Sequence, residues 1–151
     1  MRASELARTY TRVLNRGAKT NAWAVVRWCK DFTCDRYRPM GPIGYEPGGI
    51  PGITAFHEHG LIIMFEQRLQ ASQLATKLDR GTEGLIVHRV QPLDDLRFDV
   101  ICESPTLSSK ENVPYYEALR IFVASREIYP SSQVVIAMHQ NDERRTQCWV
   151  A

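Results

Sequence analysis

Apolar side chains recur at helical spacing in three segments of the chain. In residues 4–16 one stripe is formed by Leu6, Tyr10, Val13 and Leu14, and strong helix formers dominate a second segment within residues 66–81. A third stripe begins near residue 113 and ends at a proline. The second and third stripes are Ala71, Leu74, Ala75 and Leu78, and then Tyr115, Leu119, Phe122 and Val123. The sequence therefore predicts three helices.

Short runs of β-branched and aromatic residues predict strands outside these helices. The runs cover residues 22–29, 53–59, 84–91, 96–103, 133–140 and 146–150. Two of them, 84–91 and 96–103, are separated by the sequence PLDD, which is typical of a turn. We therefore expect these two runs to pair as an antiparallel hairpin.

The order of the elements predicts an α+β fold. When the two least regular runs are left out, a β-α-β-β-α-β order follows the first helix, which is the split β-α-β arrangement of ferredoxin-like folds. Right-handed crossovers would place the helices on one face of an antiparallel sheet, with the N-terminal helix added to it. A length of 151 residues favours a single domain, 1–151. This fold class hosts many unrelated activities, so it does not decide the function.

Residues 39–52, PMGPIGYEPGGIPG, contain four of the eight prolines and five of the nine glycines. Proline fixes φ and glycine permits a positive φ, so we expect a series of turns instead of a helix or a central strand. Apolar side chains are spaced through the segment, which indicates a loop anchored on the domain. The loop is either a long connection or a binding loop, and Tyr45 is its candidate contact residue for a small molecule or a larger partner.

The net charge of +2 conceals an uneven distribution. Residues 1–40 carry nine basic and three acidic side chains, whereas the other 111 residues carry ten basic and fourteen acidic ones. Arginine predominates in the basic part, and its planar guanidinium suits phosphates and carboxylates. The pattern indicates an acidic partner, although pairing with the acidic remainder of the chain would also explain it. The candidate binding residues are Arg8, Arg12, Arg16, Lys19, Arg27, Lys30, Arg36 and Arg38, together with Tyr45.

The triplet His57-Glu58-His59 is the strongest candidate for metal chemistry. In an extended strand the two imidazoles point to the same side and could share a divalent metal ion. Cys29 and Cys34 would complete a Cys2His2 set, but zinc sites of that kind space their histidines more widely. Histidines without a ligand at the end of a strand are the alternative interpretation.

The His-x-His pair is also similar to the metal motif of rolling-circle nucleases, whose fold is a split β-α-β sandwich with a tyrosine nucleophile on a helix. The resemblance implies Tyr115 or Tyr116 as that nucleophile. Two features depart from the family pattern: the central residue is Glu58 where the family has a hydrophobic one, and the lysine downstream of the tyrosine is missing. These departures put the nuclease activity in doubt.

Composition narrows the remaining choices. Hydrophobic residues at 44% and charged residues at 24% are typical of a globular domain, and the longest apolar run, LIIMF at 61–65, is too short to cross a bilayer. Four cysteines are too few for a disulfide scaffold. The N-terminal residues lack the apolar stretch of a signal peptide, so we expect a cytoplasmic protein that does not enter a membrane.

The sequence therefore favours a small interaction protein that binds nucleic acid or an acidic protein surface, as a binder, inhibitor or regulator. The alternative is a metal-dependent hydrolase or nuclease that uses His57 and His59.

Overall fold

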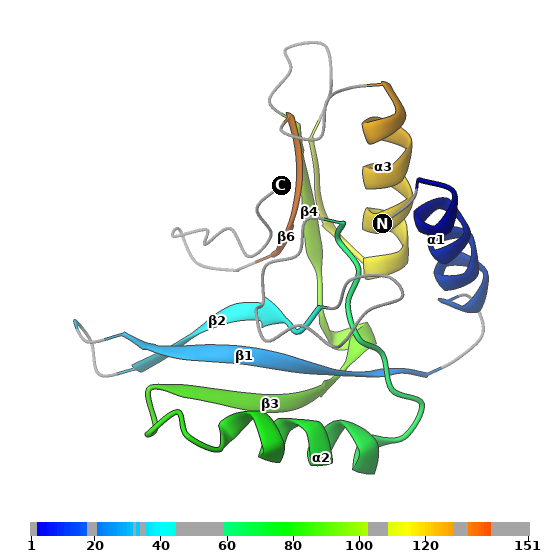
Figure 1. Cartoon of the computed structure of the whole chain (residues 1–151). Helices are drawn as coiled ribbons and strands as arrows, with labels where there is room; N and C mark the ends of the chain where they lie inside the picture. The colour runs from blue at the N-terminus through cyan, green and yellow to red at the C-terminus, as the bar shows by residue number, and fades with distance from the viewer. Residues whose placement is uncertain are drawn as a thin grey trace.

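The structure is a computed structural model, and it describes residues 3–17, 21–31, 33, 36–44, 59–102, 109–128 and 133–139. Its elements in chain order are α1 (Ala3–Gly17), β1 (Trp23–Asp31), β2 (Arg36–Pro42), α2 (Arg68–Asp79), β3 (Ile86–Pro92), the 3-10 turn η1 (Leu93–Asp95), β4 (Phe98–Cys102), β5 (Lys110–Val113), α3 (Tyr115–Ile128) and β6 (Val134–Met138). Figure 1 shows α2 against the sheet that contains β1 and β3, α3 against the sheet that contains β4 and β6, and α1 beside α3. The predicted α+β class and the N-terminal helix are confirmed.

The described strands form two antiparallel sheets, with the orders β2-β1-β3 and β5-β4-β6. This differs from the single ferredoxin-like sheet that the sequence suggested. The predicted hairpin between 84–91 and 96–103 is wrong, because β3 pairs with β1 while β4 pairs with β5 and β6. Leu93 and Leu96, at the two ends of the PLDD turn, are both buried in the larger core. Burial of these leucines directs the chain from one sheet into the other.

The first sheet carries α2 on one face. Ala71 and Ala75 are buried, and their small side chains let the helix lie close to Val25 and Ile43. The helix ends at Asp79, and Gly81 follows with a φ of 82° in a turn in which Thr82 donates its backbone N–H to the Asp79 carbonyl at 3.4 Å. A small apolar core therefore fills the space between α2 and the sheet.

The start of the proline- and glycine-rich segment belongs to β2, a strand that the sequence analysis did not find. Among the described strands, β2 pairs with β1 alone, and it contains Pro39 and Pro42. An edge strand tolerates proline because one side of it makes no ladder hydrogen bonds. Residues 45–52 lie outside the described part of the chain. The predicted strand at 146–150 does too, as does the predicted strand at 53–59 except for residue 59.

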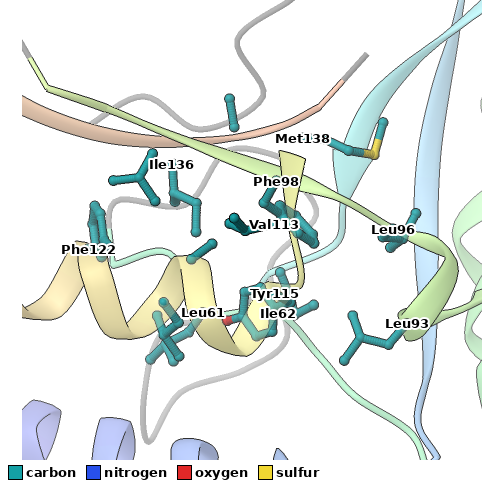
Figure 2. Close-up of a cluster of buried hydrophobic side chains, with 14 of the residues drawn as sticks. Leu61, Ile62, Leu93, Leu96, Phe98, Val113, Tyr115, Phe122, Ile136 and Met138 are labelled. Carbon is teal, nitrogen blue, oxygen red and sulfur yellow. The ribbon is translucent and has the colours of Figure 1, made fainter. Parts of the chain in front are cut away.

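The larger core lies between α3, the second sheet and the other face of the first sheet. Figure 2 shows Phe122 and Tyr115 from α3 beside Phe98 of β4 and Ile136 of β6, and all four side chains are at most 1% exposed. α1 adds Tyr10 and Val13 to the same core. These are residues of the helical stripes that the sequence predicted.

Residues 59–66 form an extended strap that connects the layers. Ile63 donates its backbone N–H to the carbonyl of Ile43, and Phe65 exchanges two backbone hydrogen bonds with Trp23. Three tyrosine hydroxyls from the helices donate to the strap: Tyr10 to the His59 carbonyl at 2.8 Å, Tyr115 to the Gly60 carbonyl at 2.7 Å and Tyr116 to the Met64 sulfur at 3.2 Å. The strap therefore joins α1 and α3 to the first sheet.

Candidate interface for an acidic partner

The structure divides the predicted basic residues between two surfaces. Arg8, Arg12 and Arg16 belong to α1, whereas Arg27, Lys30, Arg36 and Arg38 belong to β1 and β2. Arg16 pairs with Glu66, and the neighbouring Phe65 bridges to Trp23, so α1 ends beside the start of β1. The paired ends of β1 and β2, at Asp31 and Arg36, lie at the other end of β1, roughly 26 Å away at 3.3 Å per residue. Figure 1 shows α1 and these ends of β1 and β2 on opposite sides of the molecule.

In the described part of the chain, three of these arginines bond to other side chains of the protein. Arg16 forms its ion pair with Glu66, and Arg38 forms one with Asp31. The Nε of Arg27 donates to the Nε2 of His88 at 3.1 Å. Internal pairing therefore accounts for part of the basic set, and these bonds could not be anticipated from the spacing of charges along the chain.

Arg27, His88 and Asp79 form a chain of hydrogen bonds between the sheet and α2. Arginine can only donate, so His88 Nε2 must accept and the imidazole is neutral, with its proton on Nδ1. That Nδ1 lies 2.7 Å from Asp79 Oδ1, which also accepts the His88 backbone N–H at 2.8 Å. Both ring nitrogens are thus engaged, and His88 holds the end of α2 against the sheet.

Burial shifts the pKa values of two residues of β1, Arg27 and Cys29. Desolvation lowers the pKa of Arg27, and the neighbouring Cys29 acts in the opposite direction. Desolvation also raises the pKa of Cys29, with Arg27 opposing the shift. The thiol is therefore a poor source of thiolate despite the adjacent guanidinium, and Arg27 acts as a structural donor more than as a cation for a partner.

The more exposed cations are better placed than Arg27 to meet a partner. Arg12 on α1 and Arg36 on β2 are exposed, and neither forms an ion pair with any of the described residues. Arg8 is also exposed, and its Nε contacts the Ser4 carbonyl of its own helix at 3.4 Å. Lys30 and Arg38 are partly exposed on the hairpin of β1 and β2. Lys19 and Tyr45 lie outside the described residues.

Arg89 joins this group and was missed by the sequence analysis. It is exposed on β3, and its guanidinium carbon lies 5.3 Å from the ring centroid of Trp28 on β1. The pairing of β1 with β3 places it there, opposite Val26. A basic residue inside a strand-like run was the signal available, but the partner strand could not be inferred from it.

We use the name cationic end of the first sheet for Lys30, Arg36 and Arg38, near the paired ends of β1 and β2, together with Arg89, which lies farther along the sheet opposite Val26. The three strands of this sheet carry five basic side chains and a single carboxylate, Asp31. The strands of the second sheet, in contrast, carry Lys110 against Asp99 and Glu111. Positive charge is therefore concentrated on one layer of the fold.

Of the predicted metal residues, only His59 and Cys29 lie in the described part of the chain, so a metal ion shared by His57 and His59 stays a prediction. His57 and Cys34 fall outside the described ranges. The His59 carbonyl accepts a hydrogen bond from the Tyr10 hydroxyl of α1. Cys29 lies on β1, opposite Arg38 of β2. Within the described ranges, no group of three or more His, Cys, Asp or Glu side chains is arranged to hold a metal ion. Tyr115 and Tyr116, the nucleophiles implied by the nuclease resemblance, donate to Gly60 and Met64.

A second carboxylate–histidine pair lies in the second sheet. Asp99, only 2% exposed, accepts from His139 Nδ1 at 2.8 Å and from the Asn112 backbone N–H at 2.8 Å. Arg97 in turn donates to the side chain and the carbonyl of Asn112. The buried carboxylate thus connects β4 with residues on β5 and next to β6, which is a structural role.

We expect Asp79→Ala to lower the free energy of unfolding by about 1–3 kcal/mol, because it leaves two buried donors of His88 without their acceptor. Urea unfolding followed by circular dichroism measures this difference. Asp95→Ala, an exposed carboxylate in η1, is the control and should stay within about 0.5 kcal/mol of the parent protein. Equal stability of the Asp79 variant and the parent would contradict the assigned role of His88.

Comparison of the chain with models of protein families, with curated proteins and with solved structures found no match. None of the helices in the described ranges combines the length and the apolar composition needed to span a bilayer.

Proposed function

We propose that this protein binds an acidic macromolecule, either a nucleic acid or an acidic protein surface, through the cationic end of its first sheet. The observation that carries the proposal is that Lys30, Arg36, Arg38 and Arg89 stand against a single carboxylate, Asp31, on the three strands of that sheet. Like charges concentrated on one layer produce a positive field that attracts and orients an acidic partner. Such binding suits a regulator or inhibitor of another macromolecule.

The hairpin of β1 and β2 supports the proposal by its position. β2 is an edge strand, and Figure 1 shows the hairpin reaching past the second sheet. Arg36 is exposed near the turn, and Arg38 is partly exposed beside it. Arginine forms paired hydrogen bonds to phosphates and carboxylates, so two arginines on an accessible edge favour an acidic ligand.

The outer face of α1 is a separate surface and not part of the proposed site. Arg8 and Arg12 are exposed there, but they lie about one strand length from the hairpin turn. A small partner could not contact both surfaces at once. The α1 arginines therefore provide a control with the same chemistry at another place.

A pair of charge reversals separates the two surfaces. We expect Lys30→Glu with Arg36→Glu to weaken binding to labelled heparin, a soluble polyanion, at least about tenfold, or 1.4 kcal/mol. The matched control, Arg8→Glu with Arg12→Glu, changes the net charge equally and should weaken binding by less than about threefold, since it leaves the hairpin intact. Fluorescence anisotropy measures the affinities, and circular dichroism verifies that both variants fold.

Three outcomes would count against this assignment. Absence of heparin binding by the parent protein would remove the proposed function. Equal losses in the two variants would mean that net charge, and not the cationic end of the sheet, governs binding. A larger loss in the α1 variant would move the site to the helix.

A further inference from the structure

Two aromatic side chains lie on the same face of the first sheet as part of its cationic end. Trp28 and Lys30 are two residues apart on β1, and Tyr37 is paired with Lys30 across the β1–β2 ladder. Residues at these positions point to one face of the sheet. It is the face opposite α2, because Val25 packs under α2 whereas Trp28 packs toward the larger core.

Both rings are held in place before any ligand arrives. The Tyr37 hydroxyl donates to the carbonyl of Gly84, which precedes β3, so the ring lies across β1. Arg89 from β3 covers Trp28 with its guanidinium 5.3 Å from the ring centroid. Trp28 and Tyr37 are both partly exposed. Fixed planar groups on a sheet lose little conformational entropy when another planar group stacks on them.

Their spacing suits successive bases of an extended strand. Trp28 is paired with Pro39, so Tyr37 is its diagonal neighbour on the same face. Such diagonal positions are roughly 7–8 Å apart. Aromatic rings and arginine planes on a sheet surface stack unpaired bases, and nearby cations contact the phosphates between them.

The other acidic partners use less of this surface. A duplex keeps its bases stacked inside and offers phosphates alone to a flat face, and an acidic protein offers carboxylates alone. Either would contact Lys30 and Arg36 but would leave the planes of Tyr37 and of the Trp28–Arg89 pair unused. A single strand engages the charges and the rings together.

Building on the proposed function, we infer that the acidic partner is a single-stranded nucleic acid. Its bases stack on Tyr37 and on the Arg89 guanidinium that covers Trp28. Its phosphates meet Lys30, which is paired with Tyr37, and Arg36 and Arg38 on the edge strand β2.

Three labelled probes test this inference: an oligothymidine, the same strand in a duplex with oligoadenosine, and poly-L-glutamate. We expect the parent protein to bind the single strand at least about tenfold more tightly than the duplex or the polypeptide, because stacking adds to the shared charge contacts. Tyr37→Leu should weaken single-strand binding by about 5- to 100-fold and leave the other two probes unchanged. Tyr37→Phe, which keeps the ring, should bind the single strand within about threefold of the parent protein.

Arg89→Lys provides a second variant that keeps the charge and removes the plane. It should weaken single-strand binding about fivefold or more and leave poly-L-glutamate binding unchanged. If the duplex and the polypeptide bind as tightly as the single strand and neither Tyr37→Leu nor Arg89→Lys has an effect, the inference fails while the proposed function stands. If none of the three probes binds, the proposed function fails as well.

Discussion

Gly60→Ala is expected to destabilise the protein by about 2–5 kcal/mol, because two separate penalties fall on one residue. Gly60 has a φ of 69°, a left-handed conformation in which a Cβ costs about 1–2 kcal/mol. A Cβ there would also lie 3.1 Å from Ile136 Cγ2 and 3.2 Å from Phe122 Cε1. Both neighbours are 1% exposed, and forcing extra volume into a packed core costs about 1–3 kcal/mol.

The packing around Gly60 leaves little room for relaxation. Figure 2 shows Phe122 on α3 and Ile136 on β6 in the same packed core. The Gly60 carbonyl also accepts the buried hydroxyl of Tyr115. Movement of the strap away from the new methyl group would stretch that hydrogen bond, so Phe122 and Ile136 must instead give by a few tenths of an ångström.

Gly81→Ala isolates the conformational part of this effect. Gly81 has a φ of 82°, but a Cβ there would meet no atom within 4 Å. We expect a loss of only about 1–2 kcal/mol at this position. Urea unfolding of both variants gives the packing contribution as the difference between them. Equal losses would show that the strap yields around Gly60, and the close packing described here would then be incorrect.

The helices could be predicted because their signals are local. The stripes on residues 4–16 and around Tyr115 follow the helical repeat, and the structure buries Tyr10, Val13, Leu119 and Phe122 on those stripes. Gly81, just after α2, is a local feature of the same kind, because glycine permits the positive φ that this turn has. Such features depend on neighbours within one or two turns, so they can be recognised from the sequence alone.

The pairing of strands could not be predicted in the same way. PLDD has the composition of a hairpin turn, yet burial of Leu93 and Leu96 separates β3 from β4. The second half of β2 contains two prolines and lies in the segment predicted to form turns, although an edge position tolerates them. β5, with the sequence KENV, is polar apart from Val113 and has no alternating pattern. These outcomes depend on contacts between distant segments.

The sequence predicted a basic candidate site but not the arrangement of its residues. Clustering of arginine among residues 1–40 suggested one basic face, whereas the strand β1 separates the α1 arginines from those of the hairpin. Arg27 proved to be a donor to His88, which follows from the register of β1 with β3. Arg89 joined the group through the same register. The sequence specifies which residues are charged, whereas the pairing of the strands determines which of them lie close together.

A steep dependence of binding on salt is the second large effect expected. Each phosphate contacted by a lysine or arginine releases counterions, and for single strands the logarithm of the affinity falls by about 0.7 per contact for each tenfold rise in salt. The cationic end of the first sheet contains Lys30, Arg36, Arg38 and Arg89, of which Arg38 also pairs with Asp31. With three or four contacts, affinity should fall roughly 20- to 50-fold between about 50 and 200 mM salt.

Replacement of two of these cations should reduce, in proportion, the slope of the logarithm of the affinity against the logarithm of the salt concentration. The variant with Lys30→Glu and Arg36→Glu loses two contacts, so its slope should be shallower by about 1.4. The α1 control with Arg8→Glu and Arg12→Glu should keep the slope of the parent protein. This comparison distinguishes contacts at the sheet from a general attraction between charged molecules.

The affinity of the parent protein for labelled oligothymidine at about 50 and 200 mM salt, measured by fluorescence anisotropy, is the most direct test of a phosphate-binding surface at the end of the first sheet. The proposal expects the roughly 20- to 50-fold loss and its reduction in the hairpin variant alone. An affinity that stays constant with salt, or a slope that the hairpin substitutions leave unchanged, would contradict it.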